Sequence, residues 1–246
     1  MSKVVVITGG GNGFGYELVK KFLNEGWQVI TSFHSDEGKE NLNSIATMAL
    51  KYTFMDLEHN RSIKEFIDFI SKNSEKVDCL INNAATANYI GPILSIPIEN
   101  WEKVLKVNFL AQHKIIFSLF KIKYLSEGAS IINITSRAAT KAFNLLGPYG
   151  VSKGALEVYT KYLANELREK GIRANSVGIS ADTNLYRKHA LEKANYGYTK
   201  TLERIGKEYM PQASHSINPV FFLASNESKY ITGEHIEATT MEIPLN

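Results

Sequence analysis

The chain begins with a strand pattern that runs directly into a glycine-rich turn and an amphipathic helix. Residues 3–8 (KVVVIT) form a β-branched run, which is typical of a strand buried on both faces of a parallel sheet. Five glycines lie between positions 9 and 15, and apolar residues then recur at helical spacing until Gly26, a helix stop. A strand, a tight turn and a helix in this order predict the first unit of an α/β fold.

The same alternation of strands and helices continues to residue 177. It predicts one domain over residues 1–246, an α/β fold of the Rossmann-like type with a doubly wound parallel sheet flanked by helices. The polar segment 182–216 breaks the pattern and is interpreted as a substrate loop over the site. The later strands are predicted at 27–33, 51–55, 77–83, 129–135 and 173–177, and the later helices at 36–50, 61–72, 99–124 and 149–170.

Composition and charge exclude several classes of function. The 28 basic and 25 acidic residues leave a net charge of +3, so no nucleic-acid partner is predicted. No apolar run approaches the roughly 18 residues of a membrane span, and the single cysteine, Cys79, has no second thiol for a disulfide or a metal motif. We therefore expect a cytoplasmic protein without a membrane partner, in which Cys79 is a small buried residue. The six histidines lack metal-ligand spacing, so no metal is expected.

The glycine-rich turn is a candidate phosphate site. It lies between a strand and a helix, where backbone N–H groups and the positive end of the helix dipole face an anion. Its spacing, G-x-x-x-G-x-G, departs from the usual dinucleotide fingerprint, and a tight turn that requires positive φ is the competing interpretation. The strand-turn-helix context favours nucleotide binding. The turn residues predicted to contact a cofactor are Gly9, Gly11, Asn12, Gly13, Phe14 and Gly15.

A tyrosine and a lysine lie one helical turn apart. Tyr149 and Lys153 have i, i+4 spacing, which places the phenol and the ammonium on the same helix face. A nearby positive charge favours phenolate, so we expect the pKa of Tyr149 to lie below 10 and the phenol to act in general acid-base catalysis. A packed tyrosine beside a solvated lysine is the competing interpretation, because Y-x-x-x-K occurs by chance in many helices.

Several spaced motifs decide between these interpretations. The turn at residues 8–15 reads T-G-x-x-x-G-x-G, residues 82–85 read N-N-A-A, and Ser136 stands 13 residues before Tyr149. Over nearly its whole length the chain therefore resembles the classical short-chain dehydrogenase/reductase family. The resemblance implies an NAD(P)(H)-dependent oxidoreductase that transfers hydride between a nicotinamide and a small-molecule carbonyl or alcohol, as a ketone or oxoacyl reductase.

The resemblance also implies roles for four catalytic residues. Tyr149 would give a proton to the substrate oxygen, and Ser136 would hydrogen-bond the same oxygen. Lys153 would lower the pKa of the tyrosine and bind the nicotinamide ribose. Asn108 would hold a water that links the lysine to solvent. The competing interpretations are that Ser136 caps a strand end and that Asn108 satisfies backbone groups within a helix.

Cofactor preference turns on the end of the second strand. Family members that select NAD place an acid there, and this position falls on Phe33, with Ser32, His34 and Ser35 able to donate to a 2′-phosphate. NADP(H) is therefore the expected cofactor, and NAD(H) stays possible because acids follow at 36–37. An acid near the adenine falls on Asp56, which could equally cap the next helix. The implied contacts outside the turn are Phe33, His34, Asp56, Leu57, Asn83, Ala84, Tyr149 and Lys153.

The family pattern also implies partners and leaves alternatives open. Two apolar helices suggest a homo-oligomer, most simply a tetramer. Residues 175–180 lack the proline and glycine of the family's N-x-V-x-P-G loop, which keeps open a catalytically silent dinucleotide-binding sensor or complex subunit. An epimerase or dehydratase would need a longer C-terminal region. The apolar positions are Val104, Leu105, Val107, Phe109, Leu110, Val151, Ala155, Leu156, Tyr159 and Leu163.

Overall fold

The computed structural model describes residues 2–207 and 211–238 and contains a parallel sheet with seven strands in the described part. The order is β3-β2-β1-β4-β5-β6-β7, and every neighbouring pair is parallel. The predicted doubly wound α/β fold is thus confirmed. The strands are β1 (Val4–Ile7), β2 (Gln28–Phe33), β3 (Leu50–Phe54), β4 (Val77–Asn82), β5 (Leu125–Ser136), β6 (Arg173–Ile179) and β7 (His235–Ala238).

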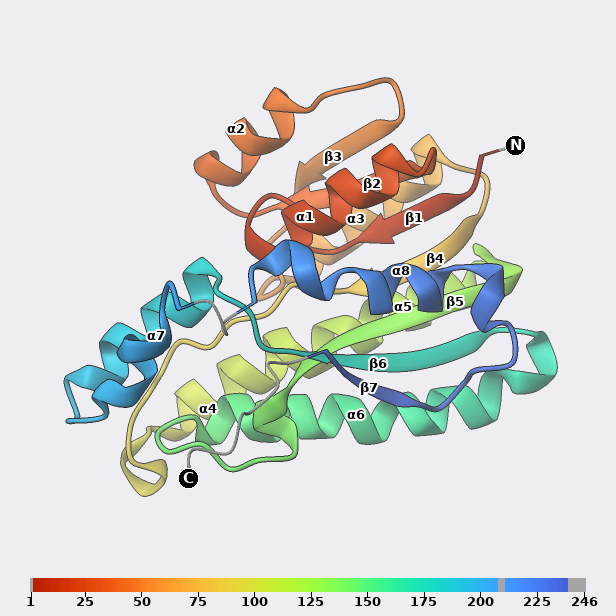
Figure 1. Ribbon diagram of the computed structural model, residues 1–246. Coiled ribbons are helices and arrows are strands. Elements are labelled where there is room, and N and C mark those ends of the chain that lie inside the picture. Colours follow the sequence, from red (N-terminus) through yellow and green to blue (C-terminus); the bar gives the residue numbers. More distant parts are fainter. Residues whose placement is uncertain (1, 208–210, 239–246) are drawn as a thin grey trace.

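Helices cover both faces of this sheet (Figure 1). Helices α1 and α8 pack on one face, and α3, α5 and α6 pack on the other. No helix of the described residues is long and apolar enough to cross a membrane. The helices are α1 (Gly13–Asn24), α2 (Asp36–Ser44), α3 (Asn60–Asn73), α4 (Ile98–Leu105), α5 (Ala111–Lys121), α6 (Gly147–Leu167), α7 (Asn184–Ala194) and α8 (Asn218–Ala224).

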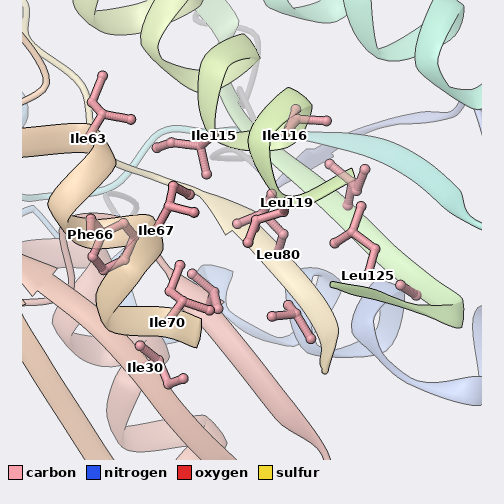
Figure 2. Close-up of a cluster of buried hydrophobic side chains, with 14 of the residues drawn as sticks. Ile30, Ile63, Phe66, Ile67, Ile70, Leu80, Ile115, Ile116, Leu119 and Leu125 are labelled. Atoms are coloured by element: carbon pink, nitrogen blue, oxygen red, sulfur yellow. The ribbon is translucent and has the colours of Figure 1, made fainter. Parts of the chain in front are cut away.

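Two apolar cores result, one on each face. On the α3 and α5 side, Figure 2 shows Ile67 and Ile70 of α3 facing Leu80 of β4, with Leu119 of α5 next to Leu80. On the α1 side, Phe22 meets Trp27 edge-on, with ring centroids 5.1 Å apart. Cores on both faces explain why the strands are apolar throughout rather than alternating.

Three details of the predicted elements were wrong. The helix predicted over 99–124 is interrupted by a π-helical turn at Lys106–Leu110 and ends at Lys121. The stretch 36–50 is helical only as far as Ser44. Strand β7 was not predicted, because four residues at a sheet edge carry little periodic signal.

The arrangement places a crevice where the strand order reverses. β1 pairs with β2 on one side and with β4 on the other, so the chain turns away in opposite directions at the carboxyl ends of β1 and β4. The segment 182–216 supplies α7 and two short 3₁₀ turns; its residues 208–210 lie outside the described residues. Figure 1 shows α7 beyond the carboxyl ends of β1 and β6.

Candidate active site

A cavity of about 450 Å³ lies at the carboxyl ends of the central strands. Every residue that the sequence predicts to contact a cofactor lines this cavity. These residues come from the carboxyl ends of β1, β2, β3 and β4, from the turns that follow them, and from the start of α6. Asn108 and Ser136 are not among its described lining residues. The expected contacts found in its lining are Gly9, Gly11, Asn12, Gly13, Phe14, Gly15, Phe33, His34, Asp56, Leu57, Asn83, Ala84, Tyr149 and Lys153.

Gly15 and Gly13 in the first turn are required for two different structural reasons. A Cβ added to Gly15 would lie 2.1 Å from the carbonyl oxygen of Gly9, so this position has no space for a side chain. Gly13 has φ +54°, and a Cβ there would meet nothing nearer than Thr183 at 3.9 Å. Gly13 also lines the cavity, so an added side chain would take up space that a ligand needs.

Hydrogen bonds from β2 and β4 fix the turn. The Gly9 N–H donates to Ser32 Oγ over 3.0 Å, and the Asn83 side chain donates to the carbonyl oxygens of Thr8 and Gly9 over 3.0 and 3.1 Å. Thr8 Oγ1 accepts from the backbone N–H groups of Asn83 and Ala84, each over 3.0 Å. The side-chain amide of Asn83, which is expected to bind a cofactor, therefore stabilises the conformation of the turn. Thr8 and Ser32 carry structural roles that no local motif signals.

Ser32 and Ser35, which are expected to donate to a 2′-phosphate, both accept hydrogen bonds within the protein. Ser32 is buried and accepts from Gly9. Ser35 Oγ caps α2 by accepting from the Gly38 N–H, and it also accepts from Asn12 Nδ2, both over 3.1 Å. In these bonds each serine accepts, so no hydroxyl hydrogen is used by them, and both residues line the cavity; donation to a 2′-phosphate therefore stays a prediction. His34 is 71 % exposed at the cavity.

Asp56 lines the cavity and also stabilises the turn that contains it. One carboxylate oxygen accepts from the Glu58 N–H over 2.8 Å. The other lies 3.6 Å from Nε2 of both His34 and His59. Helix α3 begins at Asn60 with His59 at its N-cap, so Asp56 does not cap that helix. The capping alternative is therefore wrong, and the cavity position agrees with the expected place near an adenine.

The first two turns of α6 carry Tyr149 and Lys153. Lys153 is 2 % exposed, and its ammonium donates to the Ile134 carbonyl oxygen over 2.8 Å. The same Nζ lies 5.8 Å from the centroid of the Tyr149 ring. Burial lowers the pKa of Lys153 to about 8. A lysine with this pKa exchanges protons readily near neutral pH.

The pKa of Tyr149 is raised, which contradicts the expectation from sequence. Burial of the phenol is the larger cause, and a hydrogen bond with the Ser136 side chain acts in the opposite direction. The Lys153 ammonium, which donates to the Ile134 carbonyl, does not reverse the effect of burial. Tyr149 is therefore a protonated phenol at neutral pH, which is the form of an acid rather than a base.

Ser136 ends β5 beside this tyrosine. Its side chain hydrogen-bonds the phenol, and its Oγ accepts from the Ala138 N–H over 3.2 Å. The residue thus caps the turn after the strand, as one interpretation expects, and it also contacts Tyr149. Its hydrogen bond to a substrate oxygen, which the other interpretation implies, stays a prediction.

Asn108 lies fully buried within the π-helical turn. Its Nδ2 donates to the Thr86 carbonyl over 2.8 Å and to Ser152 Oγ over 3.0 Å, while its Oδ1 accepts from the Thr86 N–H over 2.8 Å. Both amide hydrogens are therefore used. A relay water would have to bind the remaining Oδ1 lone pair or the main chain. The side chain holds Thr86, which lines the cavity, in place.

The altered stretch at 175–180 continues a strand. β6 runs to Ile179, where the family pattern has its proline, and Ser180, at the position of the glycine, follows the strand. Ile179 lines the cavity together with Thr183, Asn184 and Leu185 from the 182–216 segment. The start of the segment therefore lines the cavity, whereas Tyr196 and Tyr198 are half-exposed and are not among the described lining residues. Its role as a substrate loop stays a prediction.

Comparisons with known proteins agree on the family. The family described as Enoyl-(Acyl carrier protein) reductase matches residues 9–239. "Dehydrogenase/reductase SDR family member 4" of Bos taurus is 29 % identical and covers 96 % of this chain and 85 % of its own. "NADPH-dependent aldehyde reductase 1, chloroplastic" of Arabidopsis thaliana is 30 % identical, covering 94 % and 83 %. A short-chain dehydrogenase family protein of Francisella tularensis superimposes with a TM-score of 0.82 at 27 % identity, covering 97 % and 98 %.

Proposed function

The chain belongs to the classical short-chain dehydrogenase/reductase family, and from this premise we propose that it is a ketone or oxoacyl reductase that prefers NADP(H). The observation that carries the proposal is the single cavity in which the glycine-rich turn, the end of β2 and the Tyr149–Lys153 pair meet. Relatives of this family are oxidoreductases that act on small molecules.

The described residues fit a dinucleotide. The Gly9–Gly15 stretch runs into the first turn of α1, which begins at Gly13, so backbone N–H groups and the positive helix end would face a pyrophosphate. Asp56 and Leu57 would contact the adenine, and Lys153 would bind the nicotinamide ribose. When bound, the nicotinamide supplies or accepts the hydride.

The protein's own side chains then handle the proton. Tyr149, protonated because burial raises its pKa, donates the phenolic proton to the substrate oxygen. Ser136 donates a hydrogen bond to that oxygen and holds it against the phenol. Lys153 stabilises the phenolate that forms, because its ammonium lies 5.8 Å from the ring centroid. In the direction of alcohol oxidation the same groups act in reverse.

A carbonyl panel with NADPH tests the proposed function. Steady oxidation of NADPH with at least one ketone, aldehyde or oxoacyl thioester is the expected result. A catalytically silent sensor would bind the cofactor and raise the melting temperature without turnover. That outcome would refute the proposal and favour the alternative, which only the altered 175–180 stretch supports.

We expect NADPH to be preferred to NADH. Phe33, which carries no charge, lines the cavity where a carboxylate would repel a 2′-phosphate, and the exposed His34 lies beside it. One or two charge-assisted hydrogen bonds of about 1.5–3 kcal/mol each correspond to a factor of roughly ten or more in KM. Titration of both reduced cofactors with one carbonyl substrate measures the ratio. A kcat/KM for NADH that equals or exceeds that for NADPH contradicts the prediction.

A double variant locates the phosphate contact. His34→Ala combined with Lys39→Ala should abolish most of the preference, because His34 lines the cavity beside Phe33 and Lys39, in the first turns of α2, is the other candidate donor to the phosphate. Lys200→Ala, an exposed lysine in the 182–216 segment, is the matched control. If the double variant keeps the preference, the phosphate is recognised by other residues.

We also expect a homo-oligomer, a tetramer in its simplest form. The outer faces of α5 and α6 expose Phe117 (53 %), Val158 (55 %) and Tyr162 (65 %), which single core-facing helices do not need. Of the apolar positions named from sequence, Val104, Val107 and Leu156 belong instead to the interior. Light scattering should give a multiple of the 27.5 kDa chain mass, and Val158→Glu should lower it. A monomer at micromolar concentration would disprove the expectation.

A further inference from the structure

Helix α7 places two polar side chains in the protein interior, one helical turn apart. His189 is 7 % exposed and Lys193 is 6 % exposed, although α7 belongs to the largely polar 182–216 segment. Their i, i+4 spacing sets both on the same helix face. A buried imidazole and a buried ammonium on one face cost free energy unless each has a hydrogen-bond partner.

His189 lies against the proposed catalytic acid. Its ring meets the ring of Tyr149 edge-on, with centroids 5.7 Å apart and an interplanar angle of 71°. The imidazole hydrogen-bonds the backbone of Ala87, while its Nε2 atom has no hydrogen-bond partner among the described residues and no contact with solvent. Since Nε2 is the unpartnered atom, Nδ1 is the nitrogen that serves the Ala87 backbone.

The neutral form of His189 presents a hydrogen-bond acceptor. Burial, with a smaller contribution from the charge of Lys193, lowers the pKa of His189 to about 4. The ring is therefore neutral at physiological pH, with its proton on Nδ1 and a lone pair on Nε2. This lone pair needs a donor.

Lys193 presents the complementary donor. Its Nζ lies 5.6 Å from the centroid of the Phe143 ring and, unlike His189 Nε2, is not among the fully buried atoms without a hydrogen-bond partner; the described residues offer it neither a carboxylate nor another acceptor. Burial lowers its pKa, which is the expected result for an ammonium without an anionic partner.

A hydroxyl group has both the donor that His189 lacks and the acceptor that Lys193 lacks. Its hydrogen can be donated to His189 Nε2, and its oxygen can accept from the Lys193 ammonium. A carboxylate would pair with Lys193 but would set an oxygen lone pair against the lone pair of Nε2. An apolar group would leave both residues unpaired.

We propose that His189 and Lys193 form a subsite for a hydroxyl group of the substrate, next to the carbonyl that Tyr149 protonates. This inference rests on the proposed function and names its substrate class as hydroxylated ketones and aldehydes. Because Nε2 has no solvent contact, α7 must shift to admit the substrate, as lid segments do.

Matched substrates test the subsite. Hydroxyacetone and butanone differ by a hydroxyl in place of a methyl group, and pyruvate carries a carboxylate next to the ketone. The wild type should show a kcat/KM for hydroxyacetone roughly 10- to 100-fold above that for butanone, because the butanone methyl leaves two buried polar groups unpaired. A ratio near one overturns the subsite, and pyruvate as the best of the three overturns the assignment to a hydroxyl.

Two variants assign the effect to the residues. His189→Phe keeps an aromatic edge against Tyr149 but removes both nitrogens, and Lys193→Met keeps the side-chain stem but removes the charge. Each should bring the hydroxyacetone-to-butanone ratio close to one, whereas a merely structural role would lower both rates and keep the ratio. Lys200→Met, which removes an exposed lysine of the same segment, should keep the wild-type ratio.

A binding measurement separates this inference from the proposed function. Hydroxyacetone should raise the melting temperature of the wild type more than butanone does, and this difference should disappear in Lys193→Met. Turnover of carbonyls without any hydroxyl preference refutes the subsite alone. Selective stabilisation by hydroxyacetone without turnover of any carbonyl refutes the proposed function and supports the subsite.

Discussion

Replacing Tyr149 with phenylalanine should lower kcat by about 10²- to 10⁴-fold, the usual contribution of a positioned general acid. The substitution removes the phenolic proton and the hydrogen bond with Ser136, and it leaves the ring and its packing against His189 in place. Binding of NADPH, measured by titration of its fluorescence, should be almost unchanged. Stability should also change little, because the lost hydrogen bond contributes about 1 kcal/mol.

The control for this prediction is a tyrosine outside the site. Tyr230 is 88 % exposed on the surface, so Tyr230→Phe removes a hydroxyl without touching the cavity and should retain wild-type turnover. If Tyr149→Phe keeps more than about a tenth of the wild-type kcat, the phenol is not the general acid.

Lys153→Met should lower kcat by at least about 10²-fold and weaken NADPH binding, without loss of stability at pH 7. The ammonium is buried, and its lowered pKa of about 8 shows that folding disfavours the charged form. Below pH 8 the lysine is charged in both the folded and unfolded chains, so the full cost of burying the charge is present. Methionine removes that cost and offsets the lost hydrogen bond to the Ile134 carbonyl.

The sign of the pH dependence distinguishes this account from a structural role. Above pH 8 the folded protein releases the Lys153 proton while the unfolded chain keeps it until about pH 10.4, so the wild type gains stability over this interval. The free energy of unfolding of wild type relative to Lys153→Met should therefore rise between pH 8 and pH 10 in denaturant titrations. A large loss of stability in the variant at pH 7 would contradict the prediction.

Local patterns in the sequence predicted the frame of the site. The glycine turn and the Y-x-x-x-K spacing each involve residues within one or two turns of backbone, so their geometry follows from the strand-turn-helix context. The carboxyl ends of parallel strands meet at one edge of the sheet, and this brought Phe33 and Asp56 to the same cavity as the turn.

Features that depend on distant partners could not be predicted. The Asn108 amide is committed to Thr86 and Ser152, which lie 22 and 44 residues away. The direction of the Tyr149 pKa depends on burial, and no spacing rule reports burial. The contact of His189 with Tyr149 bridges 40 residues and is set by the path of the 182–216 segment. A sequence pattern gives the faces of helices and strands but not which distant side chain meets them.

The three functions proposed for the site are assigned to three separate segments of the chain. The residues proposed to distinguish the two cofactors follow β2, and those proposed to move the proton lie between the end of β5 and the first turns of α6. Those proposed to recognise the substrate lie on α7, of which the first residues line the cavity. Since the three stretches approach the cavity from different directions, a substitution in one leaves the backbone of the others in place. Evolution or protein engineering could therefore change the preferred cofactor or the preferred substrate independently, while the proton-transfer step stays the same.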